Sequence, residues 1–498
     1  MMMRYLTLIN GWTITISTRW SFKIIAFIAL GTISVVAGEM LVRSAWVALF
    51  PGILLCLVIL VRGILRLEEG EAFGSLDLLA FLIPATTFIE VRIIGRLFAP
   101  DVLLACMIPL LFVAGKDREL AYKLPKTFIL LAGLWLFGQV VTDLVRHTPF
   151  RDWSRGWAKI IFFIINFAAL CMLIERRPRR IVLYAAGLSL GYTLKFFLNP
   201  DIYAIGAPWK FGYGVPLTWA IILLATVLYR EHSFHRMLVF VILAGIGLVN
   251  IIQGFRSLGG VILLTLIFLG VRSFRRRRTS NFRAVSKREF VLVIIVLLIG
   301  AWASLAVYST LAKSGILGEK AKALYERQST GKFGILLGGR LAVLSAALAI
   351  KDSPLLGHGS WAKDPRYVEL LLEIQRRLGY IFLRAPETDL IPTHSIILGA
   401  WVEAGLLGAI VWIWAAFVAM RFLSSAFGKD LKLAPFVVFF AFQFLWDLLF
   451  SPYGAVRRFE TTFLLVALIS ALNWMQEGET VPTESSCYET EGFGKRRV

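Results

Sequence analysis

Cysteine and charge are both scarce in this sequence, and each scarcity excludes a class of protein. Only 17% of the 498 residues are charged, whereas 58% are hydrophobic. A soluble protein of this length carries more charge and fewer apolar residues, so we expect one polytopic membrane domain rather than two or three soluble ones. The chain has no CxxC pair, which leaves zinc ribbons and structural disulfides without support. Its four cysteines are Cys56, Cys106, Cys171 and Cys487.

Histidine is also rare, and the spacing of its few copies argues against a metal centre. No pair shows the HxxxH or HxH spacing that places two ligands on one face of a helix or strand. We therefore expect neither a metal nor another cofactor. No GxSxG-like serine accompanies a histidine, which disfavours an intramembrane protease. The five histidines are His147, His232, His235, His358 and His394.

Long apolar runs predict an all-α protein with twelve to fourteen membrane-spanning helices. A spanning helix needs roughly 17–25 mostly apolar residues. The amino terminus has no A-x-A-like cleavage site after a short apolar core, so we expect a first spanning helix and not a removed signal peptide. The third and fourth candidates are the least secure, because they contain charged residues. The candidates are 22–39, 44–63, 76–93, 98–114, 127–144, 157–174, 180–198, 213–229, 235–254, 257–273, 289–307, 395–420, 434–451 and 459–474.

Basic residues predict the orientation of these helices. The net charge is +21, and most of it fits Lys- and Arg-rich cytoplasmic loops, with a remainder for an anionic substrate or lipid. Nucleic acid is not expected, because the basic residues lie in short loops between helices. The strongest cytoplasmic signal is the arginine run within 272–288. Counting outward from it places both termini in the cytoplasm and residues 308–393 in the periplasm.

The sequence thus divides into four parts. A membrane domain spans 1–307, a large periplasmic loop 308–393, further membrane helices 394–475, and a polar, disordered cytoplasmic tail 476–498. The loop contains twelve Lys and Arg against eight Asp and Glu. Loops longer than about 60 residues escape the positive-inside rule, yet an anionic ligand would give this charge a reason. Helical spacing predicts a helix at 340–350 and an amphipathic helix at 365–380, with Val368, Leu371, Leu372 and Leu378 on one side.

Three residues at the predicted outer boundary could carry chemistry. His394 precedes an apolar helix, and histidine is the side chain best suited to proton transfer near neutral pH; alternatively it is an interfacial or capping residue. Arg256 lies in a tight outer turn, where it could hold a phosphate or anchor the helix at the interface. Arg340 follows two glycines and opens a predicted helix, which suits an anion or simply a solvated helix start.

Other charged residues are weaker candidates. Glu403 lies nine residues after His394, on the opposite helix face and roughly 13 Å deeper, so a structural pairing with another helix is favoured. Asp447 also lies within an apolar helix, where acids are costly and face protein or water. Arg457 and Arg458 fall on the same side as His394 and are secondary candidates for substrate binding, although a plain outer charge cluster is favoured.

Three motifs together resemble the O-antigen ligase/polymerase superfamily. They are Arg256 in its outer turn, GGRLAVLSAALAIKDSPLLGHGSW at 338–361, and HSIILGAWVEAGLLG at 394–408. Members carry Gly-Arg, a Pro-Leu-hydrophobic-Gly-x-Gly turn, then His-Asn/Ser and Glu-x-Gly-x-x-Gly. The resemblance implies that Gly357 and Gly359 of the turn contact substrate and that Gly405 is structural.

The resemblance further implies a GT-C-like glycosyltransferase of the bacterial inner membrane with its active site facing the periplasm. The donor would be a glycan on undecaprenyl diphosphate, and neither metal nor nucleotide sugar would be needed. The acceptor would be a sugar hydroxyl on lipid A-core, for an O-antigen ligase, or on another lipid-linked repeat, for a polymerase. His394 would accept the hydroxyl proton, while Arg256 and Arg340 would hold the departing diphosphate.

A transporter of an anionic substrate is the competing class, since it too would be basic and polytopic. It predicts inverted repeats with Gly- or Pro-broken helices in matching positions of two halves. No internal repeat is visible in the sequence, and a transporter gives no role to the 86-residue segment 308–393. We therefore favour the transferase.

Overall fold

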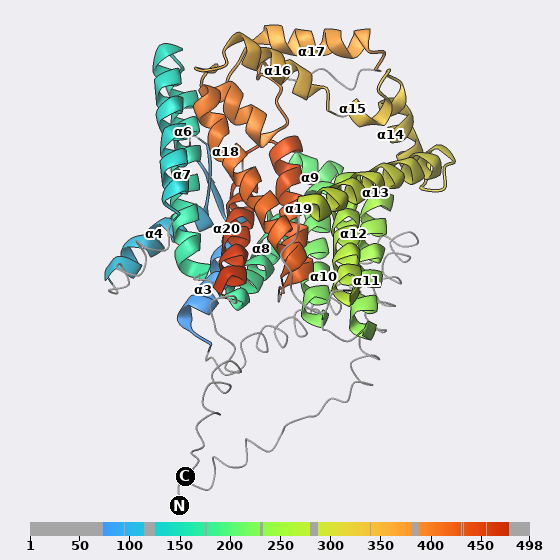
Figure 1. Ribbon diagram of the computed structural model, residues 1–498. Coiled ribbons are helices and arrows are strands. Elements are labelled where there is room, and N and C mark those ends of the chain that lie inside the picture. Colours follow the sequence, from blue (N-terminus) through green and yellow to red (C-terminus); the bar gives the residue numbers. More distant parts are fainter. Residues whose placement is uncertain are drawn as a thin grey trace, which may run out of the picture. The chain divides into compact units, whose positions relative to one another are not determined.

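The computed structural model consists of a bundle of helices and one small β-hairpin (Figure 1). The chain divides into two compact units, Met1–Arg66 and Leu67–Val498, and every residue described below belongs to the second. The structure describes residues 73–93, 95–113, 125–174, 177–229, 233–278, 287–338, 340–380, 388–429, 431, 433–454 and 456–477.

Eight helices in the described part of the chain are long and apolar enough to cross a membrane. The predicted all-α polytopic membrane class is therefore confirmed. Predicted ranges 22–39 and 44–63 lie outside the described residues, so the total of twelve to fourteen stays a prediction. The eight are α6 (Lys126–Val145), α7 (Phe150–Ile174), α8 (Pro178–Leu198), η2 (Trp209–Tyr213) continuing into α10 (Gly214–Leu228), α11 (Ser233–Ile252), α12 (Arg256–Arg278), α13 (Lys287–Lys313) and α18 (Ile396–Gly428).

Four further helices complete the bundle. The helices α3 (Ser75–Ala85), α4 (Ala99–Val113) and α19 (Ala434–Phe450) are apolar but shorter, and α20 (Arg457–Glu477) follows them. The core lies around α19, which packs against α12, α18 and α20 and buries an unbroken run of side chains over 434–444. Burying this many aromatic and aliphatic side chains makes α19 the central helix, whereas α13 packs chiefly on α12 and is the least buried of the eight long apolar helices.

The predicted helix 76–93 is wrong beyond Ala85. A 3₁₀ turn, η1 (Thr86–Phe88), follows α3, and β1 (Glu90–Arg92) then pairs antiparallel with β2 (Arg96–Phe98). The Thr87 hydroxyl donates to the Pro84 carbonyl at 2.5 Å, which ties up a group that a continuing helix would use. Lys195 of α8 donates to Glu90 at 2.6 Å.

Four helices lie across one end of the bundle (Figure 1). They are α14 (Glu319–Ser329), α15 (Gly334–Leu337), α16 (Ala342–Asp352) and α17 (Pro365–Arg377). The helices α16 and α17 correspond to the two that the sequence predicts within 308–393. We call α14–α17 and their connections the cap.

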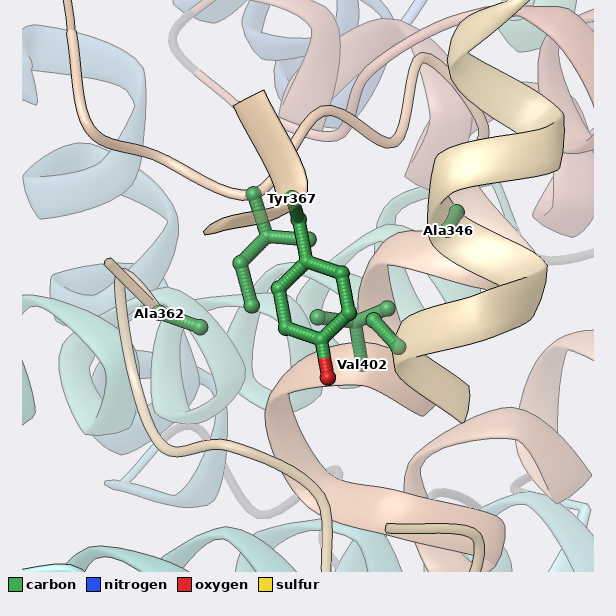
Figure 2. Packing of buried hydrophobic residues seen from close by; sticks show 6 residues of the cluster. Ala346, Ala362, Tyr367 and Val402 are labelled. Atoms are coloured by element: carbon green, nitrogen blue, oxygen red, sulfur yellow. The ribbon is translucent and has the colours of Figure 1, made fainter. Parts of the chain in front are cut away.

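Buried side chains join the cap to α18 (Figure 2). Ala346 of α16, Ala362, Tyr367 of α17 and Val402 of α18 belong to one apolar cluster. The Tyr367 hydroxyl also donates to Asp352 at the end of α16, at 2.6 Å. This packing fixes the position of α16 and α17 on α18.

Candidate functional site

Positively charged residues of three separate elements interact with one another where the cap meets the bundle. Arg256 is the first residue of α12, Arg340 precedes α16, and Lys210 lies in η2. Arg256 interacts electrostatically with both Arg340 and Lys210. In the described part of the chain, none of the three pairs with a carboxylate. We call Arg256, Arg340 and Lys210 the cation cluster.

Arg340 is held by aromatic rings from the end of α19. Its guanidinium carbon lies 4.4 Å from the Trp446 ring centroid and 3.9 Å from that of Phe450. Stacking uses the flat faces of a guanidinium and leaves its N–H edge free for oxygen acceptors. Burial, together with the charge of Arg256, lowers the pKa of Arg340 to about 10. Arg340 therefore stays cationic at neutral pH, and no carboxylate among the described residues pairs with it.

Arg256 has only uncharged partners among the described residues. It donates to the side-chain oxygen of Gln328 in α14, and its guanidinium carbon lies 5.0 Å from the Tyr308 ring centroid in α13. These contacts orient the guanidinium toward the cap without neutralising it. An anion with several oxygens would gain from both arginines at once, because each can form bidentate hydrogen bonds.

His394 has a strained backbone conformation, two residues before α18 begins. Its φ of 46° is in the left-handed region, which costs a side chain other than glycine about 1–2 kcal/mol. The next residue, Ser395, caps α18 by accepting from the Leu398 amide at 3.2 Å, and it donates to the Leu448 carbonyl of α19 at 2.9 Å. These bonds hold the strained turn in place, and such outliers are frequent at functional sites.

The electrostatic surroundings of His394 favour its neutral form. Desolvation by the surrounding protein lowers the pKa of His394 below its ordinary value of 6.5, and the charge of Lys210 lowers it further. No hydrogen-bond partner occupies the imidazole within the described residues. A neutral imidazole with a free nitrogen can accept a proton at pH 7.

Arg457 and Arg458, predicted as secondary substrate-binding residues, both pair with buried carboxylates. Arg457 contacts Asp447 at 2.5 Å, and Arg458 contacts Asp101 at 2.7 Å. Asp447 also accepts from Ser451 at 2.6 Å, so its carboxylate is fully engaged. Arg457 interacts electrostatically with Lys210 and thus borders the cation cluster. The binding roles of the two arginines stay predictions.

Gly357, Gly359 and Gly405 meet where α18 is broken. The helix leaves regular geometry at Ala404 and Gly405, and residues 353–359 insert at the break. Three backbone hydrogen bonds cross it: from the His358 amide to Val402 (2.7 Å), from Gly359 to Glu403 (3.0 Å), and from Leu406 to Pro354 (3.0 Å). We call residues 353–359 the splice segment.

Close approach explains the glycines at the break. An added Cβ on Gly357 would lie 2.6 Å from the Gly405 nitrogen, and one on Gly405 would lie 1.9 Å from the Leu355 carbonyl oxygen. The structure therefore gives Gly405 a packing role and gives Gly357 the same. The predicted substrate contacts of Gly357 and Gly359 are not needed to account for these residues, and they stay predictions.

Glu403 pairs with Lys159 of α7, which is the kind of interhelix partner that its depth in the membrane favours. The Lys159 ammonium also lies 5.3 Å from the Trp361 ring centroid. Glu403 thus belongs to the attachment between α7, α18 and the cap, and not to the surroundings of His394.

Three functional-site residues escaped the sequence reasoning. Lys210 is the third cation of the cluster. Asp143 of α6 accepts from the amide and hydroxyl of Ser360, each at 2.6 Å, and Arg146 donates to the Gly357 carbonyl at 2.9 Å. The available signal was the same for Lys210 as for Arg256: a basic residue beside an outer turn, against the positive-inside trend. No comparable signal marked Asp143 and Arg146.

Among the described residues, no group of three His, Cys, Asp or Glu side chains is placed to hold a metal ion. The arrangement is instead suited to binding a polyanion beside a neutral base. Comparison with known proteins adds no assignment: no family model matches the chain, and no curated protein matches it significantly.

Proposed function

We propose that this protein is a GT-C-like glycosyltransferase that moves a glycan from undecaprenyl diphosphate to a sugar hydroxyl of an acceptor. The site lies at the periplasmic face of the bacterial inner membrane. The observation that supports this most is the cation cluster beside His394. Two arginines and a lysine, none of them paired with a carboxylate of the described residues, suit a diphosphate. A neutral histidine suits a hydroxyl that must lose its proton.

The proposed reaction is a single inverting displacement. The acceptor hydroxyl attacks the anomeric carbon while His394 takes its proton, so a new C–O bond forms. The bond between the anomeric carbon and the diphosphate oxygen breaks, and undecaprenyl diphosphate leaves with the electron pair. Arg256 and Arg340 stabilise the charge that develops on the leaving group, a task that cations held in place perform without reorganisation.

The two arginines are held in place by different elements of the fold. Arg340 is fixed against α19, which also holds the His394 turn through Ser395 and Leu448. Arg256 approaches from α12 and is oriented by α14. A diphosphate could therefore be bound by arginines from two separate elements.

We favour an O-antigen ligase that transfers to lipid A-core over an O-antigen or exopolysaccharide polymerase, because of the motif resemblance alone. Ligase and polymerase share donor and chemistry, and the cation cluster serves either. The same proposal requires partners of matching chemistry: the lipid-linked donor, a glycolipid or glycan acceptor, and the surrounding membrane lipids. It requires no nucleic acid.

Transfer by variants in isolated membranes tests the chemistry. We expect His394→Ala to lower turnover by roughly 10²–10⁴-fold, as for loss of a general base. We expect Arg256→Ala and Arg340→Ala each to lower it by roughly 10²–10³-fold, as for loss of one charge-stabilising donor. Arg377→Ala is the matched control, because Arg377 is an exposed cap arginine paired with Glu373. Near-wild-type turnover in the histidine variant would remove the base role.

Deletion of the gene followed by gel analysis of the lipopolysaccharide separates the alternatives. Loss of all long chains, with lipid-linked polymer accumulating, indicates a ligase. Loss of chain length, with single repeats still attached, indicates a polymerase. Unchanged surface polysaccharide would count against both.

A further inference from the structure

An exposed apolar surface adjoins the cation cluster at the α8–α10 corner. The segment between α8 and α10 contains the short helix α9 (Ile202–Gly206) and then η2. Five large apolar side chains here are between 51% and 78% exposed: Leu198, Ile202, Tyr203, Ile205 and Phe211. We call these five residues the α9 patch.

The α9 patch is continuous with Lys210. The rings of Tyr203 and Phe211 are in edge contact, with centroids 6.0 Å apart. The Lys210 ammonium lies 4.9 Å from the Phe211 ring centroid. The α9 patch thus ends at the exposed Lys210, which interacts electrostatically with Arg256 and His394.

The backbone around Lys210 is built to hold it at this edge. Trp209 is buried and donates from its indole nitrogen to Asn250 of α11 at 3.1 Å, and Asn250 in turn donates to Thr218 of α10 at 3.0 Å. The chain then takes a π-helical turn that departs from helical geometry at Gly212. A Cβ on Gly212 would lie 2.4 Å from the Phe196 ring. Single π-helical turns of this kind occur often at functional sites.

We propose that the α9 patch and Lys210 form the docking site for the lipid part of the donor, a long-chain isoprenoid diphosphate. The isoprenoid lies along the α9 patch, and Lys210 is the first cation to meet the diphosphate as it enters the cation cluster. This inference rests on the proposed function, and it adds the side of the bundle from which the donor approaches.

Charge complementarity distinguishes the α9 patch from other lipid-facing surfaces. Apolar side chains are equally exposed on α13, for example Leu298 and Ile299, but no member of the cation cluster lies on α13. A ligand with a long apolar tail and two phosphate groups can contact the α9 patch and the cation cluster at the same time. A bilayer phospholipid tail needs no uncompensated cation cluster beside it.

Binding by the full chain in nanodiscs, without acceptor, tests the proposal. The probes are undecaprenyl diphosphate, farnesyl diphosphate and inorganic diphosphate. We expect Lys210→Gln to weaken all three by about tenfold, as for one charge-assisted contact. We expect Ile202→Ala/Ile205→Ala to weaken undecaprenyl diphosphate by about tenfold through lost apolar contact and to leave inorganic diphosphate unchanged. The matched control is Leu298→Ala/Ile299→Ala on α13, which should change none of the three.

The outcomes separate this inference from the proposed function. Wild-type affinity for undecaprenyl diphosphate in the α9 double variant would overturn the docking site, as would an equal loss in the α13 control. An unchanged affinity for inorganic diphosphate in Lys210→Gln would overturn the role of the lysine. If those variants bind normally while Arg256→Ala and Arg340→Ala lose binding, the docking site fails and the proposed function stands. If the wild-type protein binds none of the probes, both fail.

Discussion

Replacing Gly405 by alanine tests the break in α18 directly, whatever the protein does. Gly405 has φ 63° and ψ −158°, a region that is accessible almost only to glycine and costs other residues about 1–3 kcal/mol. The new Cβ would also lie 1.9 Å from the Leu355 carbonyl oxygen. No side-chain rotation can relieve that overlap, because the backbone fixes the position of the Cβ and the carbonyl oxygen is a backbone atom. The splice segment must therefore move.

The magnitude follows from the bonds that such a movement breaks. Three backbone hydrogen bonds join the splice segment to α18, and each contributes a net of about 0.5–1.5 kcal/mol. Adding the backbone strain gives a loss of about 2.5–7.5 kcal/mol in the free energy of unfolding, as an upper limit because strain and bond loss partly overlap. The positions of His394 and the cap depend on the same bonds, so transfer activity should fall with stability.

The assay measures the free energy of unfolding in detergent from the intrinsic fluorescence of the tryptophans. It compares Gly405→Ala with a glycine-to-alanine substitution at another position. Gly245→Ala in α11 is the control, because a Cβ there meets nothing within 4 Å. It should be neutral or stabilise the helix by up to about 1 kcal/mol. If the free energies of unfolding of Gly405→Ala and the control differ by less than about 0.5 kcal/mol, the splice segment does not contact α18 as closely as described.

Three further predictions concern the site and its support. Arg340→Lys keeps the charge but loses the planar guanidinium that contacts the Trp446 and Phe450 rings and can form bidentate hydrogen bonds. Initial transfer rates should therefore fall by at least about tenfold, though less than for Arg340→Ala. His394 must be neutral to accept a proton, and its pKa lies below 6.5, so the rate should hold as pH falls to 6.5 and decline only below it. A transfer rate that already falls above pH 6.5 would contradict the role of His394 as the base. Lys159→Met leaves the half-buried Glu403 carboxylate without its cation. It should cost less stability than the roughly 3–5 kcal/mol of a fully buried pair, and most of the loss should be recovered in Lys159→Met/Glu403→Gln.

Much of the helical framework follows from local sequence, and its failures have local causes. Residues 127–144 and 434–451 differ from α6 and α19 by a residue at most at each end, because long apolar runs between polar turns leave little choice of boundary. The range 76–93 fails past Ala85, because a tertiary contact between Glu90 and Lys195 decides the conformation of a segment with mixed signals.

The site was only partly predictable for a different reason. Arg256, Arg340 and His394 were recognisable by residue type and position beside predicted membrane ends. The electrostatic link of His394 to the two arginines runs through Lys210, however. The position of Lys210 depends on a π-helical turn that no periodicity in the sequence predicts. The splice segment bonds to backbone groups of residues 44 to 52 positions away in the sequence, and backbone bonds of this kind have no side-chain signature. Gly405 could be marked as structural, but its partner could not be named.

The break in α18 has a consequence for how the protein is made. Inside a bilayer an unpaired amide or carbonyl costs several kcal/mol, and the Val402 carbonyl and the Leu406 amide of α18 find their partners in residues 353–359. Those residues are synthesised earlier and, in the proposed topology, must already have crossed the membrane. Insertion of α18 is therefore completed by a translocated segment, so that biogenesis of this helix and folding of the cap become one event.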